Sequence, residues 1–503
     1  MKMFRPTVVV SMLAVTGSGF SFLNQLVLAR YFGTGSQMDT YLVAISLPLT
    51  VSALVVALLG YQLVPALLGA EPSLGREGAL LRSLAWGLGG IAVIVAVAGA
   101  GLAGWIVPIL DPGLSVPQYF QTERLARIAW MCLPLAVLAA IYTAGLHIRQ
   151  RFAGAALLAS APMTGSLVFC LLAHGSLGVS AAVWGQLAGY LVMPIVLRLA
   201  LGCQGPGHDW ARLRKILVDL PVAFAALLVF VIFPFSDAIW GSRLGPGTVS
   251  YLGYAQRLLI GFSGVAITGA STVLFPRLAR HAAAGRSQAL LKELGLSLRM
   301  ILVFMVPAAT VFCVLAPLTV RVLFQRGAFH DEDAAAVGVL LRPMLAGVVA
   351  MSCAGLIFKA LFARGNLSAA AALSLTGTIA YWAFSGLFGH IFGFVGIGIA
   401  YAVSWCLVLS LGLRYLWPAG LPARNCRFIV RVATASLLIG VACGLAIRSF
   451  RSAVSPGPPG LLVFVVGTWL AAAVLYVIAG NTILATEEMQ ILTRRAWRML
   501  RRA

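Results

Sequence analysis

The sequence predicts an all-α integral membrane protein with about fourteen transmembrane helices. Hydrophobic residues make up 61% of the 503 residues and charged residues only 10%, against roughly 25% charged residues in an ordinary soluble domain. Apolar runs long enough to cross a bilayer recur along the whole chain. These runs do not alternate between apolar and polar residues as barrel strands would, so helices are expected.

Each predicted helix is an apolar run of about 20 residues or more, bounded by Gly, Pro, Arg or His. In chain order the runs cover 7–29, 40–68, 83–108, 127–147, 153–174, 178–201, 216–240, 249–275, 295–320, 335–362, 368–389, 394–416, 427–447 and 460–482.

The basic residues predict the topology. The net charge is +22, and Lys and Arg alternate between the connections, with about three times as many on one side as on the other. This positive-inside pattern and an even number of spans place both termini in the cytoplasm. A nucleic-acid-binding protein would instead need a soluble basic module, so no nucleic-acid partner is expected.

An internal repeat organises the predicted helices. Similar segments recur at an offset of about 210 residues, which corresponds to six spans. The matching pairs are Arg30–Gly35 with Arg243–Gly247, Leu63–Leu67 with Leu274–Leu278, Ala79–Arg82 with Ala289–Lys292, and Ala144–Leu146 with Ala354–Leu356. Duplicated bundles of this kind are typical of transporters that rock one half against the other.

The repeat therefore predicts four regions. They are an N-lobe over 1–205, a C-lobe over 206–420, a separate helix pair over 421–485, and a basic amphipathic tail over 486–503. The tail is expected to lie on anionic lipid in the cytoplasm.

No motif indicates an enzyme. The six histidines and eight cysteines lack metal-ligand spacing, and neither a nucleophile motif nor a phosphate-binding loop occurs. We expect no catalytic residue, no bound metal and no organic cofactor. A coupling cation, Na⁺ or H⁺, or the membrane potential remains open as the energy source.

Four stretches resemble the MurJ or MviN lipid II flippase family, which belongs to the multidrug/oligosaccharidyl-lipid/polysaccharide exporter superfamily. They are Ala29–Gly35 with Asp39–Tyr41 and Leu47–Pro48, Val249–Leu258 with Phe275–Leu278, Leu323–Phe329, and Lys359–Leu361 with Arg364. The resemblance spans about residues 5 to 420 in register.

This resemblance implies two six-helix lobes around a cationic central cavity, and a final helix pair that forms a groove for a lipid tail. It also implies a multi-pass protein of the bacterial cytoplasmic (inner) membrane that flips a polyprenyl-pyrophosphate-linked saccharide by alternating access. The expected partners are this lipid-linked oligosaccharide, membrane lipids, and the enzymes of cell-wall or polysaccharide synthesis.

Five residues are candidates for the site. Arg257 matches the arginine of the family's A-D-R-L segment, and arginine suits phosphate binding; pairing with a helix carbonyl or snorkelling is the alternative. Asp39 matches the family's acid at the start of helix two, where a helix N-cap is an equally simple role. Arg342 either faces the cavity or lies at the interface, and Arg30 belongs to the first matching stretch. Asp237, after Pro234, resembles the acid that binds a coupling cation in some members.

The sequence also departs from the family. Typical members carry arginines where this chain has Ser18, Asn24 and Ser52, and acids where it has Gln256 and Ile260. A cavity with fewer cations binds a pyrophosphate less strongly, or binds another headgroup. The departures favour a divergent paralogue that moves an exopolysaccharide or O-antigen unit over the essential lipid II flippase.

Three other functions are alternatives. A cation-coupled drug or metabolite antiporter of the same superfamily has twelve helices and acidic cavity residues, which disagrees with the last helix pair and Arg257. A membrane glycosyltransferase needs larger loops with acidic catalytic pairs. A degenerate, non-transporting member would explain the missing arginines.

Overall fold

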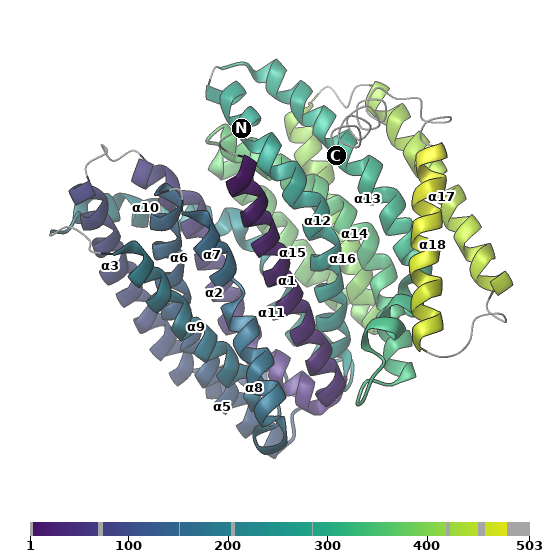
Figure 1. The fold of residues 1–503 in the computed structure, drawn as a ribbon, viewed down its shortest axis with the longest axis horizontal. Coiled ribbons are helices and arrows are strands. Elements are labelled where there is room, and N and C mark those ends of the chain that lie inside the picture. Colours follow the sequence, from purple (N-terminus) through teal and green to yellow (C-terminus); the bar gives the residue numbers. More distant parts are fainter. Residues whose placement is uncertain are drawn as a thin grey trace. The chain divides into compact units, whose positions relative to one another are not determined.

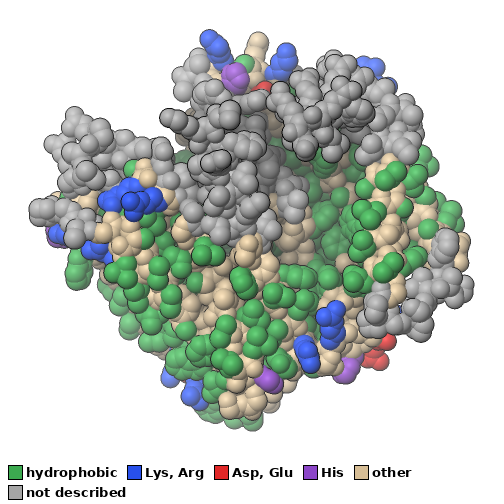
Figure 2. Space-filling model, viewed as in Figure 1, with side chains coloured by type: hydrophobic (Ala, Val, Ile, Leu, Met, Phe, Trp, Pro, Cys, Tyr) green, Lys and Arg blue, Asp and Glu red, His purple; other side chains and the backbone are tan. Residues whose placement is uncertain are grey.

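The computed structural model of the chain is all-helical, with no β-strand among the described residues. The structure describes residues 4–68, 74–149, 151–202, 207–283, 285–418, 423–450 and 458–479. Most of the coloured side chains on the face shown in Figure 2 are hydrophobic, as expected for helices that contact lipid. The predicted all-α membrane fold is confirmed, whereas the predicted tail over 486–503 lies outside the described residues.

The helices follow one another with short connections (Figure 1). The first eleven are α1 Phe4–Phe32, α2 Ser36–Leu68, α3 Leu74–Gly101, α4 Ala103–Leu110, α5 Val116–Trp130, α6 Cys132–Ile148, α7 Phe152–Leu158, α8 Ala161–Leu177, α9 Ser180–Leu201, α10 Trp210–Leu227 and α11 Phe233–Ser242. A 3₁₀ turn, Leu228–Phe230, lies between α10 and α11. The remainder are α12 Thr248–Ala283, α13 Ser287–Phe324, α14 Asp331–Ala363, α15 Leu367–Phe392, α16 Phe394–Leu416, α17 Ala423–Phe450 and α18 Pro458–Ala479.

The predicted spans coincide with these helices. Within the described residues, each of the fourteen ranges falls on one helix or on consecutive helices. Among the described residues, ten helices are long and apolar enough to cross a membrane, and a bent pair, Leu220–Phe230 with Phe233–Ser242, would make an eleventh span. The count of fourteen stays a prediction, because α1, α12 and α18 are not among these ten.

Proline and local backbone geometry explain where long helices break. Pro134 lacks the N–H that would bond to the carbonyl of Trp130, and the helix is interrupted at Met131, between α5 and α6. Pro234 lies in the first turn of α11, where the chain bends by 54° after the 3₁₀ turn. Each break therefore lies inside one predicted span and does not separate two spans.

The chain divides into two compact units. Unit 1 comprises Met1–Gly253 and Arg326–His330, and unit 2 comprises Tyr254–Gln325 and Asp331–Ala503. The division falls inside α12, so α10 and α11 belong to unit 1 although the repeat places them in the C-lobe. Compactness and repeat membership are different properties, and the lobes at 1–205 and 206–420 stay a prediction.

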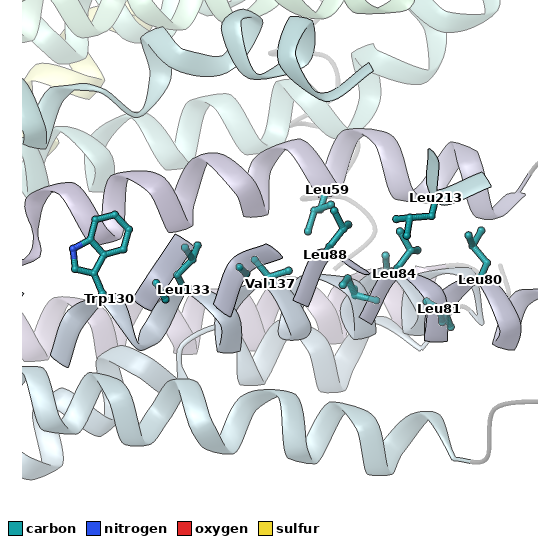
Figure 3. Close-up of a cluster of buried hydrophobic side chains, with 13 residues drawn as sticks. Leu59, Leu80, Leu81, Leu84, Leu88, Trp130, Leu133, Val137 and Leu213 are labelled. Atoms are coloured by element: carbon teal, nitrogen blue, oxygen red, sulfur yellow. The ribbon is translucent and has the colours of Figure 1, made fainter. Parts of the chain in front are cut away.

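The core of unit 1 explains why α10 belongs to it. Figure 3 shows Leu213 of α10 beside leucines of α2 and α3 in a buried cluster that extends along α6 to Trp130. The backbone N–H of Asp209, just before α10, donates a hydrogen bond to Ser83 Oγ of α3 at 2.6 Å. These contacts attach the start of α10 to α3.

In unit 2, α14 packs against α13 and α16, and α17 and α18 pack against α13. Buried side chains of α13, including Val311 and Leu315, meet Phe428 and Val432 of α17 and Ala472 of α18 in one cluster. The last helix pair is thus attached to the second unit through α13. Its role as a groove for a lipid tail stays a prediction.

Candidate functional site

The segment that joins α1 to α2, residues 30–39, meets two other connections of the chain and is called the α1–α2 corner. Its last residue, Asp39, lies in the first turn of α2 and is 8% exposed. One carboxylate oxygen accepts a hydrogen bond from the N–H of Gly247 at 2.5 Å. The other accepts from the N–H and the Oγ of Ser250, at 2.8 and 2.5 Å.

Gly247 and Ser250 lie at the start of α12, where the first turn of a helix leaves backbone N–H groups without helical partners. A carboxylate is the favoured group at such an end, because the helix dipole is positive there. Asp39 therefore caps a helix that begins about 200 residues after it. The capping role was one alternative for Asp39, but the expected helix was α2, its own.

The corner also contacts the connection between α13 and α14. The N–H of Ala328 donates to the carbonyl of Arg30 at 2.9 Å. Gly33 and Gly327 adopt φ values of +57° and +64°. A Cβ added to Gly33 would overlap the carbonyl oxygen of Ala328, and one added to Gly327 would overlap that of Arg30. Both glycines are required by conformation and by this close backbone approach.

The guanidinium of Arg30 does not take part in these contacts. The side chain is exposed and lies 6.0 Å from the centroid of the neighbouring Tyr31 ring. Tyr31 in turn stacks on His174 of α8, with the ring centroids 3.7 Å apart. In this structure Arg30 contributes to the corner through its backbone carbonyl, which accepts a hydrogen bond from Ala328. The predicted contact of its side chain with the substrate stays a prediction.

A second polar group lies near the corner, at the turn between α4 and α5. Asp111 accepts a hydrogen bond from the N–H of Gly113 at 3.0 Å, and Ser242 Oγ donates to the carbonyl of Leu110 at 2.8 Å. Burial raises the pKa of the Asp111 carboxyl above its usual range, although the bond from Gly113 and the charge of Arg243 oppose this shift. This group was not predicted from the sequence.

Asp237 lies in α11, after the bend, and is 3% exposed. Its neighbours in the chain, Ala238 and Ile239, pack with Val43 of α2 and Leu110 of α4. Among the described residues, no three His, Cys, Asp or Glu side chains are grouped as metal ligands. The role of Asp237 as a site for a coupling cation stays a prediction.

Arg257 and Arg342 both belong to unit 2. Arg257 is half-buried and lies nine residues after Thr248, the start of α12. Arg342 is exposed and lies eleven residues after Asp331, the start of α14. Within the described part of the chain, no acid forms an ion pair with either guanidinium. Arg342 thus lies inside α14, and its two predicted positions, facing the cavity or at the interface, stay predictions.

The structure thus brings together the first and third of the family-like stretches through backbone contacts, and joins the second to them through Asp39. Sequence reasoning missed Gly247 and Ser250 as partners of Asp39. The repeat offered a partial signal, because it aligned Arg30–Gly35 with Arg243–Gly247. It did not indicate that the aligned segments touch each other.

Comparisons with known proteins agree with this architecture. The family model described as "Lipid II flippase MurJ" matches residues 28–465. A probable lipid II flippase MurJ of Vibrio cholerae is 22% identical over 470 residues, covering 87% of this chain and 88% of that protein. The corresponding Haemophilus influenzae protein is 25% identical over 456 residues, covering 84% and 88%.

Solved structures show the same fold. A lipid II flippase MurJ in an inward closed conformation superposes with a TM-score of 0.80 at 17% identity, covering 95% of this chain and all of that chain. An inward-facing multidrug resistance MATE family transporter of the MOP superfamily gives a TM-score of 0.65 at 13% identity, covering 84% and 98%. Because the family model spans most of its length, the chain belongs to the MurJ family of lipid II flippases.

Proposed function

We propose that this protein is a flippase that moves a polyprenyl-pyrophosphate-linked saccharide across the cytoplasmic membrane by alternating access. The observation that carries the proposal is Arg257, a half-buried arginine inside α12 without an acidic partner among the described residues. Holding an arginine at the centre of a membrane helix costs roughly 2.5–3.5 kcal/mol on insertion scales. A phosphate that forms paired hydrogen bonds with the guanidinium offsets this cost.

The substrate is a lipid-linked saccharide of one of two kinds. The names of the bacterial relatives favour a lipid II-like peptidoglycan precursor. The neutral residues at the positions where family members carry arginines favour an exopolysaccharide or O-antigen unit. Two of these residues, Asn24 and Ser52, are buried inside unit 1, and Ser52 Oγ donates to the carbonyl of Pro48.

Alternating access requires contacts that form and break during the cycle. We assign this role to the α1–α2 corner, where Asp39 holds the first turn of α12 and the carbonyl of Arg30 holds Ala328. In this proposal both termini are cytoplasmic and the corner faces the outer side of the membrane.

The energy source in this proposal is a coupling cation at the buried Asp237, or the membrane potential. The bend before α11 supports a cation site, because an interrupted helix leaves backbone carbonyls able to bind an ion. This part of the proposal is independent of Arg257.

The proposal is tested with purified protein in liposomes that contain a fluorescent polyprenyl pyrophosphate glycan. Translocation well above protein-free liposomes is expected. A cation-coupled antiporter would instead move a small cationic drug and leave the glycan in place. A non-transporting family member would move neither, and each of these outcomes would refute the proposal.

A further inference from the structure

Three arginines of unit 1 converge on the C-terminal end of α9. Arg149 follows the last residue of α6, Arg151 precedes α7, and Arg198 lies in the last turn of α9. Their guanidinium groups donate hydrogen bonds at 2.5, 3.3 and 2.8 Å to three successive carbonyls, respectively those of Leu201, Ala200 and Gly202. Three separate segments of the chain thus form one basic group, which is called the α9 arginine cluster.

The α9 arginine cluster lies on a packed scaffold. The N–H of Arg151 donates to the carbonyl of Leu146, in the last turn of α6, at 2.9 Å. One buried apolar cluster joins the three helices, and its residues are Ala139, Leu146, Ala155, Leu197 and Leu201. The positions of the three arginines relative to one another are therefore set by contacts among α6, α7 and α9.

This cluster carries more positive charge than the end of α9 needs. The free carbonyls at the C-terminus of a helix are equivalent to roughly half a negative charge, whereas each guanidinium carries a full positive charge. Within the described part of the chain, no acid forms an ion pair with Arg151 or Arg198. Capping of α9 accounts for less than one of the three charges, so the remainder favours an anionic ligand.

The surface next to the cluster indicates that this anion carries apolar chains. Leu191, Ile195 and Arg198 are separated by four and three residues, so they share one side of α9. Leu191 and Ile195 are 50% and 51% exposed, and Leu199, beside the arginine, is 75% exposed. A soluble anion would use only the guanidinium groups, whereas a phospholipid also covers the apolar side chains.

The depth of the cluster in the membrane suits a lipid phosphate. The helices Val116–Ile148 and Ser180–Leu201 are long and apolar enough to be membrane spans, and both end at the cluster. The positive-inside pattern predicts that these ends lie on the cytoplasmic side. In that topology the guanidinium groups are at the level of the headgroups of the inner leaflet, where anionic lipids attract basic residues.

We propose that Arg151 and Arg198, together with the charge of Arg149, bind the phosphate of an anionic phospholipid of the inner leaflet. The acyl chains of this lipid lie along the side of α9 that carries Leu191 and Ile195. The lipid is a resident partner of unit 1 and is not the transported substrate. The inference therefore goes beyond the proposed function, and either one can fail without the other.

Thermal unfolding of the purified protein in detergent tests this binding. Phosphatidylglycerol, phosphatidylcholine or inorganic phosphate is titrated into the parent and into the double variant Arg151→Gln/Arg198→Gln. Phosphatidylglycerol is expected to raise the thermal midpoint of the parent, whereas phosphatidylcholine and inorganic phosphate leave it nearly unchanged. In the double variant, the phosphatidylglycerol concentration that gives half of the rise is expected to increase about tenfold or more, because two charged contacts are lost.

Two further variants separate lipid binding from capping and from general surface charge. Arg151→Lys/Arg198→Lys retains both charges and is expected to respond to phosphatidylglycerol at a concentration between those of the parent and the glutamine variant. The matched control is Arg214→Gln, at an exposed arginine of α10 that the predicted topology also places on the cytoplasmic side. Its response is expected to equal that of the parent.

Native mass spectrometry provides a measurement that needs no variant. From an equimolar mixture, the parent is expected to retain one phosphatidylglycerol molecule in preference to phosphatidylcholine. An absence of this preference overturns the inference.

Three outcomes of the unfolding experiment also overturn it. A role in capping alone would lower the midpoint of the glutamine variant equally with and without phosphatidylglycerol. An equal loss of response in Arg214→Gln would mean that the lipid is attracted by the basic surface in general. A rise that inorganic phosphate produces as well as phosphatidylglycerol would assign the cluster to a soluble anion.

Discussion

Asp39, in the first turn of α2, accepts two hydrogen bonds from Ser250, which lies 211 residues later in the first turn of α12. Together with the bond from the N–H of Gly247, these contacts make the Asp39 carboxylate the N-terminal cap of α12. The acid is almost fully buried, so its bonds are worth more than those of a surface cap.

Replacing Asp39 by Asn is expected to lower the free energy of unfolding by about 2 kcal/mol, because both carboxylate oxygens act as acceptors and a buried donor left without an acceptor costs roughly 1–3 kcal/mol. The amide keeps one acceptor oxygen and places an NH₂ group where the other oxygen stood. Thermal unfolding in detergent measures the effect. The matched control is Asp331→Asn, which removes an exposed ion pair with Arg321 and is expected to change stability by less than about 1 kcal/mol. Equal effects of the two substitutions would contradict the capping role.

The close backbone approach at the corner predicts that Gly33→Ala and Gly327→Ala are both strongly destabilising. Each combines the cost of a left-handed backbone, roughly 1–2 kcal/mol, with overlap between the new Cβ and a backbone carbonyl. Gly285→Ala separates the two effects, because Gly285 has a φ of +65° and no atom within 4 Å of the added Cβ. Thermal midpoints should fall clearly further for Gly33→Ala and Gly327→Ala than for Gly285→Ala. A common shift for all three would mean that the backbone contact adds nothing.

The raised pKa of Asp111 predicts a pH-dependent effect of Asp111→Asn. Since the pKa is higher in the folded protein than in the unfolded chain, ionised Asp111 destabilises the fold. This cost is absent below the unfolded pKa of about 3.9 and is complete once the pH exceeds the folded pKa. The stability of Asp111→Asn relative to the parent should therefore be higher at pH 7.5 than at pH 3.5. Thermal unfolding at both pH values checks this, and a difference that does not change with pH would be evidence against it.

The fold was largely predictable from the sequence, for a physical reason. In a bilayer each backbone polar group must bond within its own helix, so long apolar runs have few alternatives. Each predicted span falls on a helix or a pair of consecutive helices. The break at Met131 and the bend before Phe233 were not predicted, because a proline near the start of a helix is compatible with either a kink or an unbroken span.

The candidate site was less predictable, because it depends on contacts between distant segments. Asp39 was singled out, yet nothing in its local sequence identifies Gly247 and Ser250 as its partners. The exposure of Arg342 depends on how α14 is rotated between α13 and α16, which hydrophobic periodicity defines poorly in a helix that is apolar on most sides. Asp111 was missed because an Asp-Pro-Gly turn is common and carries no functional signal by itself.

The most direct test of the account is translocation of a fluorescent polyprenyl pyrophosphate glycan by purified protein in liposomes, compared among the parent, Arg257→Ala and Arg124→Ala. The account predicts that the parent and Arg124→Ala flip the lipid at similar rates. Arg257→Ala should lose at least tenfold in rate, while its thermal midpoint stays close to that of the parent. Undiminished translocation by a folded Arg257→Ala protein would contradict the assignment of Arg257 as the phosphate-binding residue.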